Sequence, residues 1–253
     1  MIGEKPGEII AVDRLSTDDT MSILRRYGAK ILIDRIGSIG YSRQVGVEAA
    51  KGAFLMFVDS DIKLSSGCIG RLRRELVEQD WVGIHARLLS AQSSSYWQKA
   101  EDQRFTHFYD STGLKNFENA SAALFKKEIL LRYPFDPSFR DSSEDRDLCR
   151  RLVADGHRLG ISNAVVYHYH RRELSAFLRQ RFRYGLGDAQ LGLKYRKVRI
   201  FLDPLLLALL KTIRDATRLQ FQLVPYWWTG GLAQLAGVLT GLARRWRRGS
   251  CCR

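Results

Sequence analysis

Two acidic clusters in this chain have residue types and spacings that suit catalysis. The first, Asp59-Ser60-Asp61, directly follows an apolar run at residues 53–58. Aspartates two positions apart in a tight turn can hold a divalent cation through their oxygens, and the cation can neutralise a diphosphate. The same tripeptide is equally suited to a polar turn that caps the next helix, so the sequence alone leaves both interpretations open.

The second cluster, Glu144-Asp145-Arg146-Asp147, precedes an amphipathic run at residues 148–152. Acidic residues in the first turn of a helix favour its macrodipole and accept hydrogen bonds from its free N–H groups. A general base is the alternative role. Crowded carboxylates raise one another's proton affinity and neighbouring arginines lower it, so the sequence does not fix a pKa here.

The elements that must position these clusters alternate between short apolar runs and helical periods. We expect strands at residues 8–13, 30–33, 53–58, 81–85 and 164–167. We expect helices at residues 16–28, 39–51, 68–78 and 147–154. The pattern predicts an α/β fold on a mostly parallel central sheet, whose carboxyl edge would carry the first acidic cluster.

The middle of the chain is the exception to this pattern. Residues 88–117 are polar and poorly periodic, and they include three consecutive serines at 93–95. Such a segment predicts a long excursion or a flexible loop. Apolar character returns at residues 122–131.

Several segments, taken in order, resemble the family-two glycosyltransferases over residues 8–187. They are Glu8-Ile9-Ile10-Ala11-Val12-Asp13, Ser16-Thr17-Asp18-Asp19-Thr20, Arg43, Asp59-Ser60-Asp61 and Glu144-Asp145-Arg146-Asp147-Leu148, with His168-Tyr169-His170 and Arg183-Tyr184-Gly185 near the end. The resemblance implies the nucleotide-sugar-binding α/β fold called GT-A. It also implies transfer of a sugar from a nucleotide-diphosphate donor to an acceptor hydroxyl.

The resemblance assigns four residues to the donor. Asp13 is similar to the family's nucleotide-contacting aspartate, and Arg43 to the arginine near the donor. Asp59 would face the donor ribose and Asp61 would bind the cation, Mg²⁺ or Mn²⁺, so that both belong to the metal motif. His168 stands where some members of the fold place a further metal ligand, although a histidine after a strand is more often structural.

The resemblance assigns the catalytic base to Asp145, with Glu144 as the neighbour that tunes it. In an inverting displacement Asp145 would take the proton of the acceptor hydroxyl while the metal stabilises the departing diphosphate. The donor partner would be a nucleotide-diphospho-sugar, and the acceptor a glycan or a lipid-linked molecule. This role would suit polysaccharide or glycolipid synthesis.

Two features depart from the family pattern. No Pro-Thr-Tyr-Asn-like turn precedes Glu8, so we expect a GT-A domain at residues 1–197 that lacks its first strand. The paired aspartates usual at the first motif are replaced by Asp13-Arg14, which predicts altered base recognition. A catalytically degenerate scaffold on a membrane surface therefore remains an alternative. A sugar nucleotidyltransferase is another, but the chain lacks the Gly-rich basic signature of that class.

Residues 198–253 form a hydrophobic and basic C-terminal segment. Residues 223–242 carry no charge, which matches the thickness of a bilayer core, but Pro225 and several glycines lower their hydrophobicity. Membrane insertion and an interfacial or core-packed helix both remain open. The arginines that follow, Arg244, Arg245, Arg247 and Arg248, suit an anionic membrane surface, so we expect the cytoplasmic face of the cell membrane.

Composition limits the remaining classes of function. The 253 residues include 41 Lys and Arg against 27 Asp and Glu, a net charge of +14 that favours polyanionic partners. Residues 171–199 mix basic and aromatic side chains but carry no nucleic-acid-binding motif, so we expect no nucleic acid as a partner.

Residues 1–15 contain acids and no uninterrupted apolar stretch, which argues against a signal peptide. The four cysteines show no paired spacing, which predicts neither a disulfide framework nor a zinc site.

Overall fold

The computed structural model describes residues 5–109 and 111–250, without the side chains of residues 106–107 and 247–250. The chain divides into two compact units. The first contains the chain up to Gln92, Arg104–Arg140 and Glu144–Tyr169. The second contains Ser93–Gln103, Asp141–Ser143 and the chain from His170 onward. The domain boundary that we expect after residue 197 stays a prediction.

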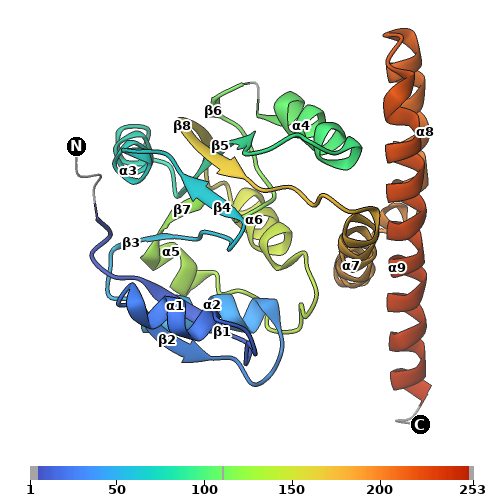
Figure 1. The fold of residues 1–253 in the computed structure, drawn as a ribbon. Helices are drawn as coiled ribbons and strands as arrows, with labels where there is room; N and C mark the ends of the chain where they lie inside the picture. Colours follow the sequence, from blue (N-terminus) through green and yellow to red (C-terminus); the bar gives the residue numbers. More distant parts are fainter. Residues whose placement is uncertain (1–4, 110, 251–253) are drawn as a thin grey trace. The chain divides into compact units, whose positions relative to one another are not determined.

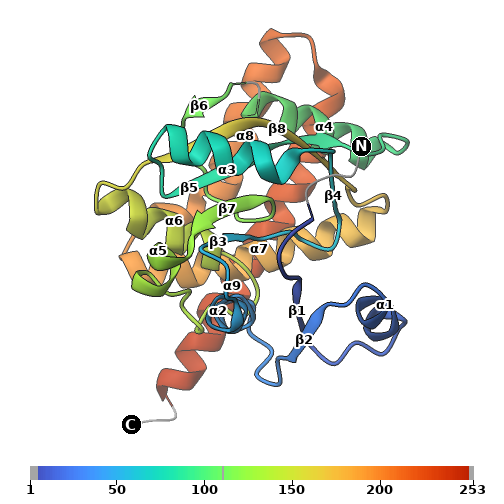
Figure 2. The same ribbon diagram turned by 90° about the vertical axis from the view of Figure 1, so that its left-hand side faces the viewer.

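The first unit alternates helices and strands as the sequence predicts. Its strands are β1 (Ile10–Asp13), β2 (Lys30–Ile33), β3 (Phe54–Met56), β4 (Ile62–Leu64), β5 (Gly83–Ser90), β6 (Gly113–Leu114), β7 (Ala123–Lys126) and β8 (Leu159–His168). Its helices are α1 (Thr20–Arg26), α2 (Ile39–Ala49), α3 (Cys68–Glu78), α5 (Lys127–Arg132) and α6 (Glu144–Ala154), with the end of α4 (Tyr96–Phe108). Figures 1 and 2 show this arrangement.

The larger sheet is mixed, so the prediction of a mostly parallel sheet is wrong. Its strand order is β3-β7-β5-β8-β4, with β6 paired to β8. Among these pairs β5–β8 is parallel, whereas β3–β7, β5–β7, β4–β8 and β6–β8 are antiparallel. The smaller sheet, β1–β2, is parallel. An apolar run reveals that a strand is buried, but its direction is set by the connections, which the run does not encode.

Two buried clusters fill the two faces of the larger sheet. Helix α3 packs on one face through Leu72 and Leu76, against Ile84 and Val166 of the sheet. Helices α2, α5 and α6 pack on the other face around Phe125. Each helix therefore buries one apolar stripe, as the helical periods in the sequence predict.

Local signals fix the start of the helix that carries Arg43. Ser38 is the N-cap of α2, and its hydroxyl accepts a hydrogen bond from the N–H of Tyr41. The single proton of the same hydroxyl is shared between the carbonyls of Pro137 (2.6 Å) and Phe139 (2.9 Å). A side chain at Gly40 would collide with the Asp136 carbonyl, so this turn of α2 lies directly against the 136–139 loop. These contacts hold the start of α2 in one place on the unit.

The segment predicted to be a loop, residues 88–117, instead contains the end of β5, helix α4 and strand β6. Helix α4 begins where the side-chain oxygen of Gln98 accepts hydrogen bonds from the N–H groups of Ser94 (3.2 Å) and Ser95 (3.1 Å). Gln98 and Glu101 are buried, so the buried face of this helix is partly polar. That polarity hides the helical period in the sequence.

The second unit is helical. Besides the first turns of α4, it contains α7 (Leu174–Tyr195), α8 (Arg199–Thr217), the short 3₁₀ helix η1 (Phe221–Leu223) and α9 (Val224–Ser250). Helices α7 and α9 approach closely, because a side chain at Gly185 would collide with the backbone of Gln234, and one at Gly237 with that of Phe182. Gly231 of α9 likewise lies against Pro204 of α8. The glycines that lower the hydrophobicity of residues 223–242 therefore serve helix packing.

The uncharged stretch at residues 223–242 lies in helix α9, apart from residue 223, which ends η1. Among the described residues, none of the helices combines the length and the apolar character needed to cross a membrane. The Cys251-Cys252 pair and the side chains of Arg247 and Arg248 lie outside the described residues.

Candidate active site

Asp59 is placed by the pairing of β3 with β7. That pairing continues past the end of β3, because the N–H of Phe57 donates to the Ala123 carbonyl (2.9 Å) and the N–H of Asp59 donates to the Ser121 carbonyl (2.9 Å). The carboxylate of Asp59 is half-exposed, at 44%. It therefore stands at the sheet edge, beside the 119–121 segment.

Asp61 and His168 are brought together by the register of β4 on β8. Ile62 lies opposite His168 in this antiparallel pair, and the N–H of Tyr169 donates to the Asp61 carbonyl (2.9 Å). The side chains meet at 3.5 Å between His168 Nε2 and Asp61 Oδ1. Two of the three predicted metal ligands are therefore direct neighbours.

Arg43 connects the two acidic clusters. Its Nε lies 2.8 Å from Glu144 Oε1 and its Nη2 lies 3.3 Å from Asp59 Oδ1. The guanidinium also lies over the rings of Phe57 and Phe135, with its Cζ 5.3 Å and 5.9 Å from their centroids. This aromatic setting fixes the orientation of the arginine. The predicted donor arginine therefore lies between the predicted metal motif and the predicted catalytic pair.

Glu144 and Asp145 occupy the first turn of α6 and have different partners. Glu144 is buried at 2% exposure and pairs with Arg43. Asp145 is half-buried; its Oδ2 accepts from the N–H of Ala120 (3.1 Å) and its Oδ1 from the N–H of Arg146 (2.8 Å). Both carboxylates are oriented, and Asp145 is the more accessible of the two.

Burial and mutual repulsion favour the protonated forms of Glu144 and Asp59. Burial raises the pKa of Glu144, and the nearby charge of Asp145 raises it further, which together outweigh the ion pair with Arg43. Burial also raises the pKa of Asp59. The positive charge of Arg43 lowers this pKa, but the negative charges of Asp61 and Asp145 raise it, and the net shift is upward. The added charge of a bound cation would relieve this crowding.

The 119–121 segment also contacts this cluster, although the sequence assigns none of its residues a catalytic or metal-binding role. Asn119 Oδ1 accepts from the N–H and the Oγ of Ser121 (both 2.7 Å), and Asn119 Nδ2 donates to the Tyr109 hydroxyl (3.0 Å). Held in this way, the segment offers the Ala120 N–H to Asp145 and the Ala120 carbonyl to Arg43. The only sequence signal was a short polar stretch before an apolar run, which does not reveal these long-range contacts.

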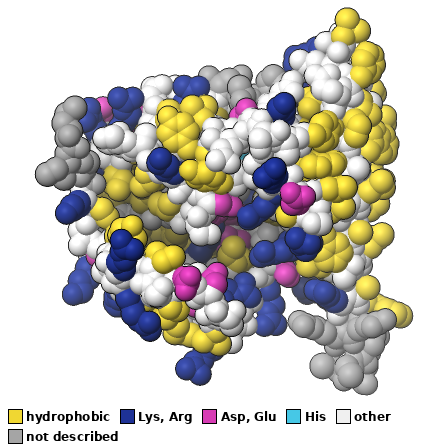
Figure 3. Space-filling model, in the orientation of Figure 1, with side chains coloured by type: hydrophobic (Ala, Val, Ile, Leu, Met, Phe, Trp, Pro, Cys, Tyr) yellow, Lys and Arg dark blue, Asp and Glu magenta, His cyan; other side chains and the backbone are white. Residues whose placement is uncertain are grey.

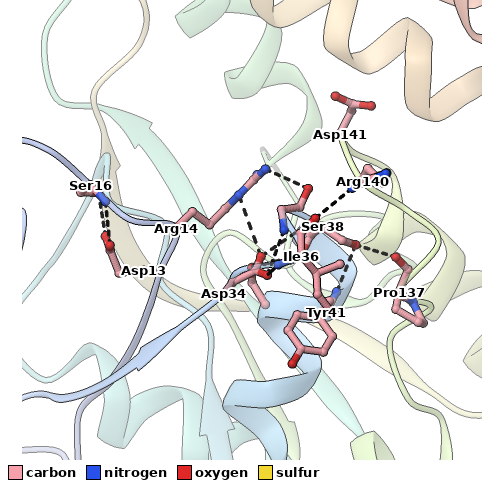
Figure 4. Close-up of polar contacts among 12 residues, drawn as sticks. Asp13, Arg14, Ser16, Asp34, Ile36, Ser38, Tyr41, Pro137, Arg140 and Asp141 are labelled. Atoms are coloured by element: carbon pink, nitrogen blue, oxygen red, sulfur yellow. Dashed lines mark hydrogen bonds and ion pairs between the residues drawn. The ribbon is translucent and has the colours of Figure 1, made fainter.

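Asp13 has local partners. Its carboxylate accepts from the N–H of Ser16 (2.8 Å) and from the Ser16 hydroxyl (2.6 Å), and Figure 4 shows both bonds. Among the described residues, no hydrogen bond or ion pair joins Asp13 to the acidic cluster around Arg43. Asp13 is the last residue of β1 and Asp34 directly follows β2, so the two aspartates mark the carboxyl ends of two parallel strands.

Asp34 was also missed by the sequence analysis. It accepts from the N–H groups of Ile36 (2.7 Å), Gly37 (3.0 Å) and Ser38 (3.2 Å), as Figure 4 shows. Burial raises the pKa of Asp34, but these bonds and one from the Ser42 hydroxyl outweigh it, so the pKa is lowered. Arg14 completes the loop by donating to the Gly37 carbonyl (2.8 Å). The available sequence signal for Asp34 was its position at the carboxyl end of the second expected strand, which corresponds to that of Asp13 at the end of the first.

The predicted metal ligands fit a cation only in part. Among the described residues, no three His, Cys, Asp or Glu side chains are arranged to hold a metal ion by themselves. The donor set of Asp61, His168 and Asp59 has the oxygen and imidazole chemistry that suits Mn²⁺, and oxygen ligands suit Mg²⁺. Protein sites for Mg²⁺ often supply one or two carboxylates and take the other ligands from substrate phosphates and water. These residues therefore fit a cation that arrives with a diphosphate.

The family is shown by comparison with known sequences. The family model described as "Glycosyl transferase family 2" matches residues 4–133. The chain belongs to glycosyl transferase family 2. The match includes Asp13, Arg43, Asp59 and Asp61, whereas Asp145 and His168 lie beyond it. A search of curated proteins finds none that matches this family member significantly.

Solved structures share the fold of this family 2 chain. A complex of S. aureus TarS 1–349 with UDP-GlcNAc has a TM-score of 0.50 at 16% identity, over 73% of this chain and 57% of that chain. The complex of TarS 1–349 with UDP has a TM-score of 0.51 at 15% identity, over 96% and 82% of the two chains. GalNAc-T7 with UDP, GalNAc and Mn²⁺ has a TM-score of 0.52 at 13% identity, over 66% and 38%. These likenesses establish a GT-A-type α/β fold with a helical C-terminal region.

Proposed function

We propose that this protein transfers a sugar from a nucleotide-diphosphate donor to an acceptor hydroxyl, with inversion and with the help of a divalent metal. The observation that carries the proposal is the arrangement around Arg43, which joins Asp59 of the first acidic cluster to Glu144 of the second. A buried, aromatic-framed arginine between two carboxylates at a sheet edge is costly to build for stability alone. The family assignment supplies independent support.

In this proposal Asp145 is the base. Two backbone N–H groups orient its carboxylate, and the carboxylate keeps lone pairs for an acceptor hydroxyl. The acceptor oxygen forms a bond to the anomeric carbon while the bond from that carbon to the diphosphate breaks. The acceptor proton passes to Asp145, and the electron pair of the broken bond leaves with the nucleoside diphosphate. Glu144 holds Arg43 and contributes to the electrostatic environment of Asp145.

Asp61, with Asp59 and His168, would hold Mg²⁺ or Mn²⁺ at the donor diphosphate. The cation would neutralise charge that develops on the leaving group. Asp59 would also face the donor ribose, and Asp13 would face the nucleotide base from the end of β1. Because the solved TarS and GalNAc-T7 complexes contain UDP, uridine diphosphates are the first donors to test.

The donor site is tested by calorimetry with uridine, guanosine and thymidine diphosphates, first with Mn²⁺ and then with a chelator. We expect metal-dependent binding of one base. Asp61→Ala should weaken that binding about tenfold or more, since it removes a charged ligand. Lys63→Ala, two residues away in β4 and pointing to solvent, is the matched control. A folded chain that binds none of the three with metal would contradict the proposal.

We propose in addition that the protein works at the cytoplasmic face of the cell membrane, on a glycan or lipid-linked acceptor in polysaccharide or glycolipid synthesis. The support is the net charge of +14 and the basic C-terminal segment, which suit an anionic leaflet. Sedimentation with vesicles of anionic and of neutral lipids tests the location. Equal binding to anionic and to neutral vesicles would contradict the proposed attraction between the basic C-terminal segment and an anionic leaflet.

A further inference from the structure

Helix α8 is apolar on the side that its own unit leaves uncovered. Its buried side consists of Ile200, Pro204, Ala208 and Asp215. Its opposite side carries five aliphatic residues at helical spacing: Leu202, Leu206, Leu209, Leu210 and Ile213. Four of these are 45–63% exposed, and Leu206 is half-buried. An exposed helix face in water is normally polar, so this distribution is inverted.

Helix α9 repeats the inversion along most of its length. The exposed positions on its open side are Trp228, Leu232, Ala236, Leu239, Ala243 and Trp246. Leu232 is 54% exposed, Leu239 58% and Trp246 77%. The other sides of α9 pack on α7 and α8 through its glycines. The apolar positions on α9 therefore form one continuous stripe.

The two stripes belong to the same helical hairpin. Pro204 and Ala208 of α8 lie against Gly231 of α9, so the helices are direct neighbours. Figure 3 shows hydrophobic side chains gathered along the right-hand edge of the picture, where α8 and α9 lie. We call the eleven residues of the two stripes the apolar face. An exposed apolar patch of this kind marks an interaction surface.

The charges on these helices identify the partner. The acids are satisfied internally: Asp203 pairs with Arg199 at 3.3 Å, and Asp215 binds Arg214 and the Trp227 indole. Beyond Arg199 and Arg214, which pair with these acids, the basic residues with described side chains are Lys211, Arg218, Arg244 and Arg245. A second copy would bring an equally cationic helical hairpin, and the like charges would repel. An anionic lipid surface instead matches both the apolar face and its basic flanks.

An open apolar groove continues this surface. Its volume is about 660 Å³, and Leu232 and Ala233 of α9 line it opposite Leu178 and Phe182 of α7. Arg179 and Arg183 also line the groove, and both are exposed. Leu232 belongs to both features, so hydrocarbon on the face can enter the groove while a phosphate meets the arginines. This combination suits a phospholipid.

We infer that the apolar face binds the surface of an anionic phospholipid bilayer, with α8 and α9 lying in the plane of the interface. A helix that spans the bilayer must be apolar all round, whereas α8 and α9 are apolar on one side and packed on the other. Trp228 and Trp246, at the two ends of the α9 stripe, have the amphipathic rings that favour the headgroup level. This inference sharpens the proposed membrane location and does not depend on sugar transfer.

The first test uses vesicles of phosphatidylcholine with about 30% phosphatidylglycerol, compared with pure phosphatidylcholine. We expect the full chain to sediment with the anionic vesicles. Leu209→Glu and Leu239→Glu should each weaken binding about tenfold or more, because burial of a charge replaces burial of an aliphatic side chain. Ile23→Glu, at a similarly exposed position of α1, is the matched control and should bind as the parent does. Circular dichroism of each variant shows that it is folded.

The second test measures depth with a nitroxide at Leu239→Cys, with Cys251 and Cys252 changed to serine; Cys68 and Cys149 are buried. An in-plane helix places the label about 5–10 Å below the headgroups. A label about 15 Å deep, at the bilayer centre, would overturn the in-plane arrangement. Equal binding by Leu209→Glu, Leu239→Glu and the parent, or no binding to anionic vesicles, would overturn the membrane face itself. Nucleotide binding, measured separately without lipid, reports on the sugar-transfer proposal alone.

Discussion

The two units of this chain carry different features at the places where we propose that they meet other molecules. The first unit buries charge, in Arg43 and Glu144 beside the half-exposed Asp59. The second unit exposes hydrocarbon, along α8 and α9. Folding alone favours neither arrangement, since burial of charge and exposure of large apolar side chains both cost free energy. In our proposals, each feature marks the place where its unit meets another molecule.

The comparison also predicts how each unit responds to substitution. Polar contacts in the first unit are directional and share partners, so a change at one residue alters its neighbours. The apolar face of the second unit is a sum of separate side chains whose loss lowers affinity in small steps. Substitutions at Arg43 and the carboxylates around it should therefore affect chemistry and stability together, and those on the apolar face should affect only binding to lipid.

The largest effect is expected at Asp145, the base of our proposal. Asp145→Asn preserves the shape of the side chain and one oxygen acceptor but cannot take a proton. We expect the rate of sugar transfer to fall about 10²–10⁴-fold. Metal-dependent donor binding should change less than about threefold, because Asp145 faces the acceptor in our proposal. Single-turnover assays and calorimetry on the same preparation measure the two quantities. A variant that transfers sugar at the parental rate would remove Asp145 from the mechanism.

The next effect concerns the buried ion pair. Arg43→Met leaves the Glu144 carboxylate buried without its partner, and we expect a loss of about 3–5 kcal/mol in the free energy of unfolding. Glu144→Gln should relieve part of that loss in the double variant, because the uncompensated charge is gone. Urea unfolding of the parent, both single variants and the double variant measures the coupling between the two sites. Additive losses would mean that the pair acts as two independent residues.

A pH effect of intermediate size is expected at His85, on β5. The imidazole is fully buried, and burial lowers its pKa from 6.5 to about 4. The unfolded chain then binds the proton more readily than the folded one, so stability is lost as pH falls from about 6.5 towards 4. The contribution is at most about 3 kcal/mol. Unfolding of the parent and of His85→Gln from pH 7.5 to 4 measures it. The variant should show a shallower decline, and equal slopes would contradict the assignment.

Strand–helix alternation in the first unit could be read from the sequence because strands and helices bury their apolar residues at different periods. Sheet direction could not be read, since the β3–β7 and β4–β8 pairings are long-range. Helix α4 was missed because its buried face includes Gln98 and Glu101. The structure brings Arg43, Asp59 and Glu144 together, and their roles toward donor and acceptor stay predictions. The contribution of Asn119 was unpredictable, because its partner His85 lies 34 positions away.

The smallest effect is expected at Arg14, which replaces an aspartate usual in the family. Arg14 is 46% exposed, donates to the Gly37 carbonyl at 2.8 Å and lies 3.9 Å from Asp34. Exposed contacts of this kind contribute little, so Arg14→Ala should cost about 0.5–1 kcal/mol in the free energy of unfolding. The same variant tests whether Arg14 only stabilises the 34–38 loop or also contacts the nucleotide. If Arg14 serves only the 34–38 loop, the affinity for nucleoside diphosphate should stay within about threefold of the parent. A tenfold loss of affinity at unchanged stability would instead place Arg14 at the nucleotide, and the replacement of aspartate by arginine would then be the feature that selects the base.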